Sequence, residues 1–397
     1  MLRAAKQPPS VQSVREVAQG VQGAVWREIS TRLLRGLRAL LEGVLEDEVT
    51  AHVGAARYER AQARRGHRNG HYPRDLVTTH GPLPRLRVPR LLEGGVEFTR
   101  FDTYQRRQAA VDAAIGQLFL QGISTRKLTA IARDLFGASV SASTVSNTTA
   151  VLDADLQAYQ TKPLTDDVVF LFLDGISQKV RELGIEGKVM LCAFGIHADG
   201  TKARLSFRLA DVEDTVSWRG FLVDLKSRGL NGKTLQLITV DGNPALLTAR
   251  REVYPLRRLQ RCIAHKPRNV VVTLKRAQRE ACMGEAKLIF GAPSRTEAIR
   301  RVRAWRTKWL DEAEAAVRCL EKDLFHCFHY SSFPRALWRT IRTTTILERA
   351  FREVRRRTRP MGVLTNAESA ERIMYGVTQG LNASWKERSL RQIQQNA

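Results

Sequence analysis

The sequence lacks any apolar run long enough to cross a membrane, and it is poor in cysteine. Clean apolar runs such as Val168–Leu173 are far shorter than the roughly 20 residues that a membrane helix needs. The first residues also lack the apolar stretch of a secretory signal. Five scattered cysteines are an odd set, which argues against a disulfide framework. We therefore expect a cytoplasmic protein with reduced thiols and no membrane partner.

Acidic residues are also in short supply. The chain has 65 Lys and Arg against 40 Asp and Glu, which leaves a formal net charge of +25. A surplus of this size favours a polyanionic partner, because phosphates that bind Lys and Arg release their condensed counterions. Nucleic acid is therefore the favoured partner, and a basic but otherwise ordinary soluble protein is the alternative.

The N-terminal part is predicted to hold one long helix and one hairpin. Residues 1–28 are interpreted as a flexible segment, since the first ten residues contain Gln and two Pro. Apolar residues recur at helical spacing over Ile29–Val53, which predicts an amphipathic helix. Arg57–Arg74 is crowded with Arg, His and Gly and predicts a loop, and Leu76–Leu92 predicts a short hairpin. These elements form a predicted region of residues 29–108.

Residues 109–160 are predicted to form a helix-turn-helix-like DNA-binding region. Small residues interrupt the helical pattern at Gly122–Ser124 and at Gly137–Ser143, which leaves three helical pieces. The last helix of such a unit enters the major groove, so its polar residues would face base edges. The predicted base contacts are Ser143, Thr144 and Asn147, and the predicted backbone contacts are Arg126 and Lys127. A generic three-helix cluster would show the same pattern.

Strand-like runs begin at Asp166. The predicted order is three strands (Val168–Leu173, Val189–Ile196, Leu205–Leu209), a helix (Asp214–Ser227), a strand (Leu235–Val240) and a helix near Ala245. This order predicts a mixed α/β domain rather than a doubly wound nucleotide fold. Gly232-Lys-Thr234 looks like part of a phosphate-binding loop, but Ser227 stands where its first Gly is needed. No nucleotide cofactor is expected.

Two aspartates directly follow two of these runs, namely Asp174 and Asp241. Carboxylates at the ends of neighbouring strands can converge at one sheet edge, and their hard oxygen ligands suit Mg²⁺ or Mn²⁺. Two such ions about 3.5–4 Å apart can activate a water or a sugar hydroxyl and stabilise the leaving oxygen of a phosphodiester. Each aspartate precedes a Gly, so two plain turns are the alternative interpretation.

A third acid, Glu348, lies in the segment Thr343–Arg359, which is predicted to be helical and is dense in arginine. Taken alone, this segment is better explained as a solvated helix face with Glu-Arg pairs at helical spacing. Spacing by itself does not connect Glu348 with the two aspartates.

Cys262 and His265 have half the spacing of a zinc site. A complete site would need ligands from the downstream cluster His326, Cys327 and His329, which has no standard zinc spacing. A buried structural role for Cys262 and His265 near Asp241 is therefore the favoured interpretation.

Ordered motifs run along nearly the whole chain, from about residue 30 to 385. In the second half they are Phe172-Leu-Asp-Gly-Ile-Ser-Gln-Lys-Val-Arg-Glu182, Val240-Asp-Gly242, Gln260-Arg-Cys-Ile-Ala-His265 with Arg268-Asn269, and Glu348-Arg349 with Glu353–Arg359. In the first half they are Tyr58-Glu-Arg60, Arg68-Asn-Gly70, Tyr104–Arg107, Gly122–Arg126 and Val140–Ser146. Together these motifs closely resemble the Mutator-type transposases of bacterial insertion sequences.

The resemblance implies an α/β fold with a ribonuclease-H-like, mixed-sheet catalytic core, preceded by the mainly helical DNA-binding region. The core would comprise residues 166–270 and 340–385, and residues 271–339 would form a helical insertion. The implied active site is an Asp-Asp-Glu trio of Asp174, Asp241 and Glu348 that holds two Mg²⁺ or Mn²⁺ ions. Such enzymes hydrolyse a strand at the transposon end, and the freed 3′-hydroxyl then attacks the target DNA.

Double-stranded DNA, both transposon ends and target, is thus the expected partner of a nucleoid-associated protein. Further candidate DNA contacts are Arg268, Arg355, Arg356, Arg357 and Arg359. Joining two ends makes a homodimer or a higher oligomer the expectation. Two alternatives stay open: a catalytically inactive DNA-binding regulator, and a nuclease of the same fold that cuts without strand transfer.

Overall fold

The computed structural model describes residues 11–62, 64–92, 98, 105–181, 184–364 and 366–386. The predicted loose start up to Ser10 and the tail Gln392–Ala397 lie outside the described residues, as do Tyr104 and Glu182 of the motifs. The chain divides into two compact units. One comprises Met1–Phe119 and Ser124–Thr148, and the other comprises Leu120–Ile123 and Thr149–Ala397.

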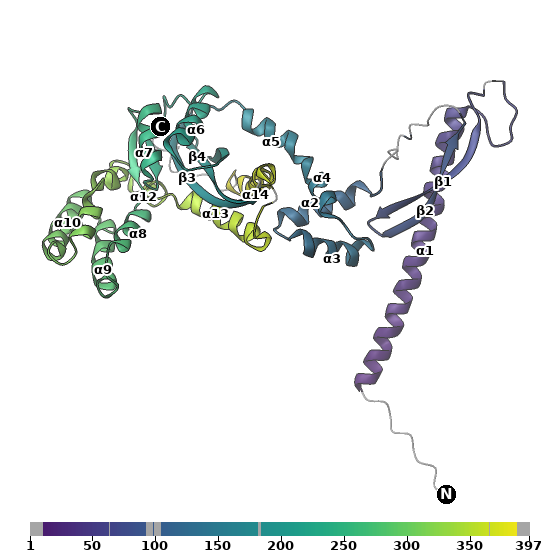
Figure 1. The fold of residues 1–397 in the computed structure, drawn as a ribbon, viewed down its shortest axis with the longest axis horizontal. Helices are drawn as coiled ribbons and strands as arrows, with labels where there is room; N and C mark the ends of the chain where they lie inside the picture. The colour runs from purple at the N-terminus through teal and green to yellow at the C-terminus, as the bar shows by residue number, and fades with distance from the viewer. Residues whose placement is uncertain are drawn as a thin grey trace, which may run out of the picture. The chain divides into compact units, whose positions relative to one another are not determined.

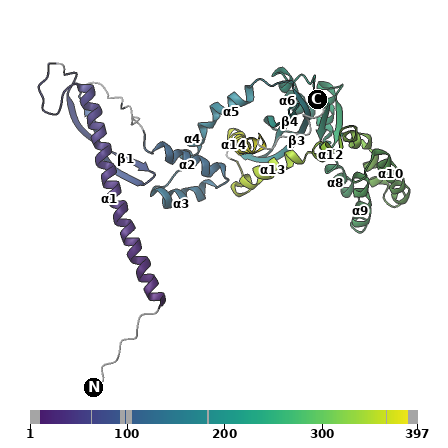
Figure 2. The same cartoon turned by 180° about the vertical axis from the view of Figure 1, so that it is seen from behind.

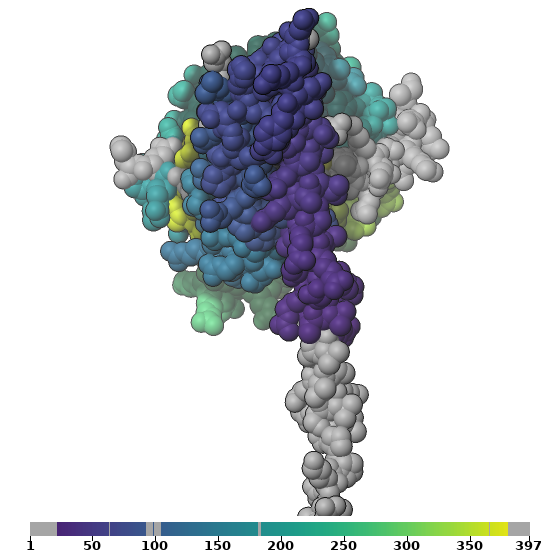
Figure 3. Space-filling view, turned by 90° about the vertical axis from the view of Figure 1, so that its right-hand side faces the viewer, coloured from purple at the N-terminus to yellow at the C-terminus, as the bar shows by residue number. Residues whose placement is uncertain are grey.

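Helix α1 is the longest element of the first unit and runs from Val11 to Val53 (Figure 1). The flexible segment predicted for residues 1–28 is therefore wrong from residue 11 onward, and no proline interrupts the helix between Val11 and Val53. Near its C-terminal end Leu45 is buried against the hairpin. The hairpin packs along α1, as the blue and purple atoms show (Figure 3).

The predicted hairpin consists of β1 (Arg68–Thr78) and β2 (Gly81–Leu91), which pair antiparallel. Its first strand starts earlier than the sequence indicated, so the predicted loop Arg57–Arg74 is wrong for its last residues. Irregular register between Arg68 and His71, and again between Arg74 and Leu76, breaks the alternation of side chains. This irregularity hides the strand from a pattern with a period of two.

Four helices follow, where the sequence predicted three. They are α2 (Ala109–Leu120), α3 (Thr125–Phe136), α4 (Ala142–Ala150) and α5 (Leu152–Thr161). Gly137 ends α3 in the left-handed region with φ of 68°, which a glycine adopts without strain. Ser141 caps α4 by accepting the N–H of Thr144 at 3.1 Å. The boundary between the two compact units falls after Thr148, inside the predicted region of residues 109–160.

The second unit is built on a five-stranded mixed sheet with the order β5-β4-β3-β6-β7. The strands are β3 (Val168–Arg181), β4 (Ile185–His197), β5 (Lys202–Ala210), β6 (Leu237–Val240) and β7 (Arg258–Arg261). β3, β4 and β5 are antiparallel neighbours, whereas β6 is parallel to both β3 and β7. The predicted mixed α/β domain is confirmed, and β7 was not foreseen.

Helices α6 (Thr215–Ser227) and α7 (Pro244–Val253) bury their apolar residues against this sheet. Trp218 and Phe221 of α6 are fully buried in the same cluster as Leu171 of β3 and Ile238 of β6. Burial of aromatic side chains of this size contributes about 2–3 kcal/mol each, so this cluster fixes the position of the sheet's central strands.

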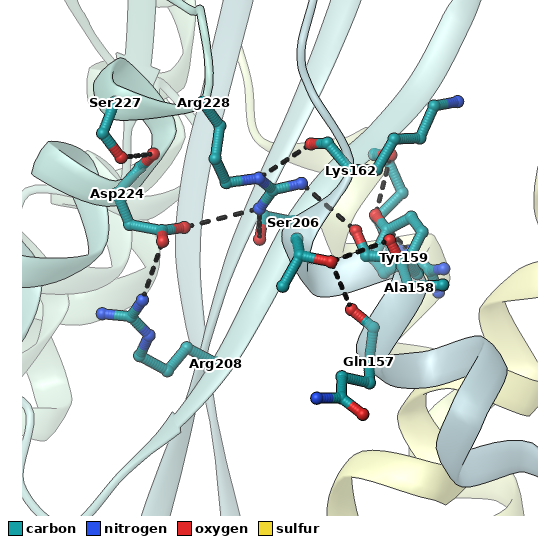
Figure 4. A network of polar contacts seen from close by, with 11 residues as sticks. Gln157, Ala158, Tyr159, Lys162, Ser206, Arg208, Asp224, Ser227 and Arg228 are labelled. Carbon is teal, nitrogen blue, oxygen red and sulfur yellow. Dashed lines mark hydrogen bonds and ion pairs between the residues drawn. The ribbon is translucent and has the colours of Figure 1, made fainter.

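Arg228, directly after α6, connects three elements of this unit (Figure 4). Its Nε donates to the carbonyl of Lys162 at 2.9 Å, and its Nη2 donates to the carbonyl of Tyr159 at 3.2 Å. Its Nη1 donates to Ser206 Oγ of β5 at 2.9 Å and also pairs with Asp224 of α6. Because the Arg228 side chain is only 8% exposed, these contacts hold α5 and α6 on β5.

The regular elements of the remaining described residues are all helices, as predicted for the stretch from Pro267 to Trp338. They are α8 (His265–Val272), η1 (Arg276–Gln278), α9 (Arg279–Phe290), α10 (Arg295–Trp309), α11 (Glu314–Glu321), η2 (Leu324–Ser332), α12 (Arg335–Ile341), α13 (Thr345–Thr358), η3 (Arg359–Met361) and α14 (Ala367–Lys386). Helices α8, α9 and α10 lie together, whereas α13 and α14 return to the sheet (Figure 2). Within the described residues no helix combines the length and the apolar character needed to span a bilayer.

Candidate active site

The parallel pairing of β3 and β6 brings two aspartates together. Its register aligns Leu173 with Val240, so the next residues on the two strands, Asp174 and Asp241, lie side by side. Asp174 is only 6% exposed. Burial and then the neighbouring charge of Asp241 raise the pKa of Asp174 to about 7. The site therefore places two carboxylates in a partly dry, mutually repulsive arrangement.

The two aspartates differ in their backbone setting. β3 continues past Asp174, which pairs with Cys192 of β4, so the turn interpretation of Asp174-Gly175 and the strand end predicted there are both wrong. β6 does end before Asp241, where Gly242 turns the chain with φ of 103°. Asp241 Oδ1 accepts the N–H of Asn243 at 3.0 Å, and this hydrogen bond fixes the turn into α7.

Glu348 lies in the first turn of α13 and belongs to the same neighbourhood. Its Oε1 accepts a hydrogen bond from Arg268 Nη1 at 2.9 Å and lies 3.5 Å from His265 Nε2. The hydrogen bond with Cys262 and the negative charges of Asp174 and Asp241 outweigh burial and raise the pKa of His265 to about 8. His265 is thus close to all three acids.

Cys262 and His265 connect the end of β7 with the start of α13. Cys262 is 1% exposed, and its Sγ accepts the N–H of Thr344 at 3.3 Å. The Thr344 hydroxyl lies 3.4 Å from His265 Nδ1. These contacts fix the first turn of α13, so they position Glu348. Among the residues that the structure describes, no three His, Cys, Asp or Glu side chains are spaced to hold one metal ion.

Glu213 is a fourth carboxylate at this site, and sequence reasoning missed it. Its Oε1 accepts a hydrogen bond from the indole Nε1–H of Trp218 at 3.2 Å. It also lies against Gly175, where an added Cβ would come within 3.0 Å of the same oxygen. Burial and the charge of Asp241 raise the pKa of Glu213, although the hydrogen bond from Trp218 opposes them. Its neighbours at the site, Gly175 and Asp241, are distant in sequence, so no local spacing pointed to it.

The candidate DNA contacts of the first unit lie on two helices. Arg126 and Lys127 of α3 are exposed, as are Ser143 and Asn147 of α4, whereas Thr144 is half-buried. The hydroxyls of Ser143 and Thr144 lie 2.8 Å and 3.0 Å from the capping Ser141 Oγ. These two side chains thus belong to the cap of α4, and Asn147 is the exposed polar group one turn further along.

The candidate contacts of the second unit fall into two groups. Arg355, Arg356 and Arg359 are exposed. Arg357, in contrast, has a side chain only 12% exposed, and its Nη1 donates to Glu353 Oε2 at 2.6 Å. The structure therefore gives Arg357 an internal role in place of the predicted DNA contact. Arg268 is 63% exposed and pairs with Glu348, so it belongs to the acid site as well.

Comparison with known proteins identifies similar chains over almost the full length. The family model described as "Transposase, Mutator family" matches residues 12–388. The transposase for insertion sequence element ISRM5 of Rhizobium meliloti is 34% identical over 88% of this chain and 88% of its own length. The transposase for IS406 of Burkholderia multivorans is 34% identical over 88% and 90%. The transposase for IS256 in transposon Tn4001 of Staphylococcus aureus is 29% identical over 93% and 94%.

Proposed function

This chain belongs to the Mutator family of transposases, and we propose that it cuts the ends of its own insertion sequence and joins the freed 3′-hydroxyls to target DNA. The observation that carries this proposal is the register of β3 and β6, which sets Asp174 beside Asp241. The charges of both aspartates act on His265, and His265 Nε2 lies 3.5 Å from Glu348 Oε1. The strand order β5-β4-β3-β6-β7, with helices inserted between β7 and α13, supports a ribonuclease-H-like core.

The donor set at the two aspartates fits a divalent metal. Burial and mutual repulsion raise the pKa of Asp174, and a cation would relieve both effects. We propose that Asp174 and Asp241 hold Mg²⁺ or Mn²⁺, with two ions expected and Glu348 as the third acid. When bound, the ions would supply an activated water or hydroxyl and stabilise the leaving oxygen.

Arg268 has a second part in this proposal. In the protein alone it neutralises Glu348 and keeps this acid from repelling the aspartates. Coordination of a metal by Glu348 would free the guanidinium of Arg268. Because Arg268 is largely exposed, it can then contact a DNA phosphate beside the reacting bond.

The surface chemistry supports DNA as the substrate. Exposed Arg126, Lys127 and Asn147 on α3 and α4 supply phosphate and base contacts in the proposed helix-turn-helix. Exposed arginines on and after α13 supply further phosphate contacts, in line with the net charge of +25. Since two transposon ends must be held at once, we propose a homodimer or a larger assembly.

Incubation of the full chain with labelled end DNA and Mg²⁺ or Mn²⁺ tests this function. We expect nicked and joined products from the unchanged protein, and a loss of roughly 100-fold or more from Asp174→Asn, Asp241→Asn and Glu348→Gln. Asp214→Asn is the matched control, since Asn caps α6 as well as Asp does and this carboxylate is exposed.

The products separate the competing functions. DNA binding without any metal-dependent cutting by the unchanged protein would identify a catalytically inactive regulator. Cutting without joined products would identify a nuclease of the same fold. Equal activity of Asp174→Asn and Asp214→Asn would rule out the acid pair as the catalytic centre.

A further inference from the structure

Two arginine side chains behind Asp241 are buried without acceptors for their N–H groups. Arg261, the last residue of β7, is 4% exposed, and Arg250 of α7 is 7% exposed. Within the described part of the chain, Nε and Nη1 of Arg261 and Nε and Nη2 of Arg250 have no hydrogen-bond partner. A buried donor without an acceptor is costly, and a charged one more so. Such groups therefore point to a ligand that satisfies them.

Arg261 lies directly against the turn that follows Asp241. A Cβ added to Gly242 would come within 1.1 Å of Arg261 Nη1 and 1.6 Å of its Cζ. Any side chain at position 242 would therefore take the place of this guanidinium. Because Gly242 has no side chain, the guanidinium of Arg261 can lie against the backbone directly after Asp241, a proposed metal ligand.

His326 of η2 is the third member of this cluster. Its Nδ1 is buried and has no partner among the described residues. Burial lowers the pKa of His326, and the charges of Arg250 and Arg261 lower it further against the opposing charge of Asp323. The charges of both guanidiniums therefore reach the His326 ring.

The backbone around the cluster is firmly held. Gln260, fully buried on β7, donates through Nε2 to the carbonyl of Cys327 at 2.9 Å. Its Oε1 accepts the N–H of Tyr330 at 2.8 Å, and His329 Nδ1 lies 2.6 Å from the carbonyl of Leu259. These bonds fix η2 on β7, so Arg261 and His326 are presented by rigid elements.

We propose that Arg250, Arg261 and His326 form a phosphate-binding site beside Asp241-Gly242, and that a backbone phosphate of the DNA fills it. That the phosphate comes from DNA rests on the proposed function. A planar guanidinium can donate two parallel N–H hydrogen bonds to the oxygens of a phosphate. The negative charge of a phosphate also complements the positive charge of the two buried arginines. Both arginines are more than nine-tenths buried, so a charged ligand that accepts their N–H groups would relieve a large desolvation cost.

The first measurement uses inorganic phosphate and the full chain at constant ionic strength. We expect phosphate to raise the melting temperature of the unchanged protein and of Asp174→Asn, but not of Arg250→Met or Arg261→Met. Arg251→Met is the matched control, since Arg251 is the next residue of α7 and is exposed. It should keep the full shift. An equal shift in all of these variants would overturn the site.

The second measurement identifies the source of the phosphate. End DNA with a neutral methylphosphonate at one linkage at a time is bound to the unchanged protein and to Arg261→Met. We expect one linkage whose neutralisation weakens binding on the order of tenfold in the unchanged protein and not in the variant. The other outcome is a phosphate-induced rise in melting temperature that depends on both arginines while no linkage shows this effect. That result would assign the site to free phosphate and overturn the proposal that DNA fills it.

Two further controls keep these outcomes distinct. Arg261→Lys retains the positive charge but loses the planar pair of N–H donors, so it should fold even if Arg261→Met does not. It should still lose most of the rise in melting temperature that phosphate causes. DNA cutting by the unchanged protein is scored separately. If cutting fails while the phosphate shift and the sensitive linkage persist, the proposed function is lost and the phosphate site stands.

Discussion

At the scale of single residues, the site depends on side chains whose properties come from distant parts of the chain. Asp174 is an ordinary aspartate in an apolar strand until the register of β3 and β6 sets Asp241 beside it. Gly242 looks like a turn glycine, yet the guanidinium of Arg261 occupies the space where a Cβ would be. In both cases the chemistry lies in a pair of residues that the sequence separates widely.

The raised pKa of Asp174 predicts a pH dependence of stability. The folded protein binds a proton at Asp174 up to pH of about 7, whereas the unfolded chain releases it near 4, so the contribution of Asp174 to stability falls as pH rises between these values. We expect Asp174→Asn to be more stable than the unchanged protein at pH 8, by at most about 4 kcal/mol, and nearly equal to it at pH 4.

Urea unfolding of the two proteins at pH 4, 6 and 8, without divalent ions, measures this difference. The gap in the free energy of unfolding should grow with pH. A gap that stays constant over this range would contradict the pKa shift, since it would reflect only a difference in packing.

At the scale of elements, Arg228 predicts how firmly α5 and α6 are tied to β5. Removing its side chain leaves two carbonyl groups, a hydroxyl and a carboxylate without their shared donor. We expect Arg228→Ala to lower the free energy of unfolding by about 2–4 kcal/mol. Arg219→Ala is the control, since Arg219 lies on α6 and pairs with Glu252 at the exposed surface.

Chemical denaturation of both variants tests this assignment. The Arg219→Ala protein should unfold at nearly the same denaturant concentration as the unchanged chain, because exposed ion pairs contribute little. Equal destabilisation by both substitutions would show that the four contacts of Arg228 stabilise the fold no more than an exposed ion pair does.

The same scale shows which elements the sequence could predict. β3, β4, β5 and β6 follow apolar runs, and burial on both faces makes such runs stand out. β7 reads Arg-Leu-Gln-Arg and has no apolar run, because its long polar side chains make internal hydrogen bonds or face the Gly242 turn. The hydrophobic periodicity of a sequence does not reveal tertiary partners of this kind.

The active-site prediction divides in the same way. Strand context alone indicated the aspartate pair, whereas Glu348 was indistinguishable from a surface glutamate of an arginine-rich helix. Only the family motifs connected it with the aspartates. The structure supplies the physical link, since Arg268 and His265 of α8 both contact Glu348. Glu213 and Arg261 escaped prediction because their contacts with Gly175 and Gly242 are tertiary.

At the scale of the whole molecule, the net charge of +25 predicts DNA binding that weakens steeply with salt. We propose that three of the positively charged residues, the exposed Arg355, Arg356 and Arg359, contact DNA phosphates directly. Each phosphate contact contributes roughly 0.9 to the slope of log affinity against log salt concentration. Replacing all three by Gln should therefore reduce the slope by about 2–3.

A control with the same loss of charge separates contact from general attraction. Three exposed arginines in or near the helical insertion serve for it, namely Arg276, Arg303 and Arg339. Their joint replacement by Gln should leave the slope almost unchanged, because charges more than about 10 Å from the DNA are screened at 0.1 M salt. Fluorescence anisotropy with end DNA from 50 to 300 mM salt measures both slopes. If the two triple variants lose the same amount, the arginines on and after α13 act only through net charge and do not contact the DNA.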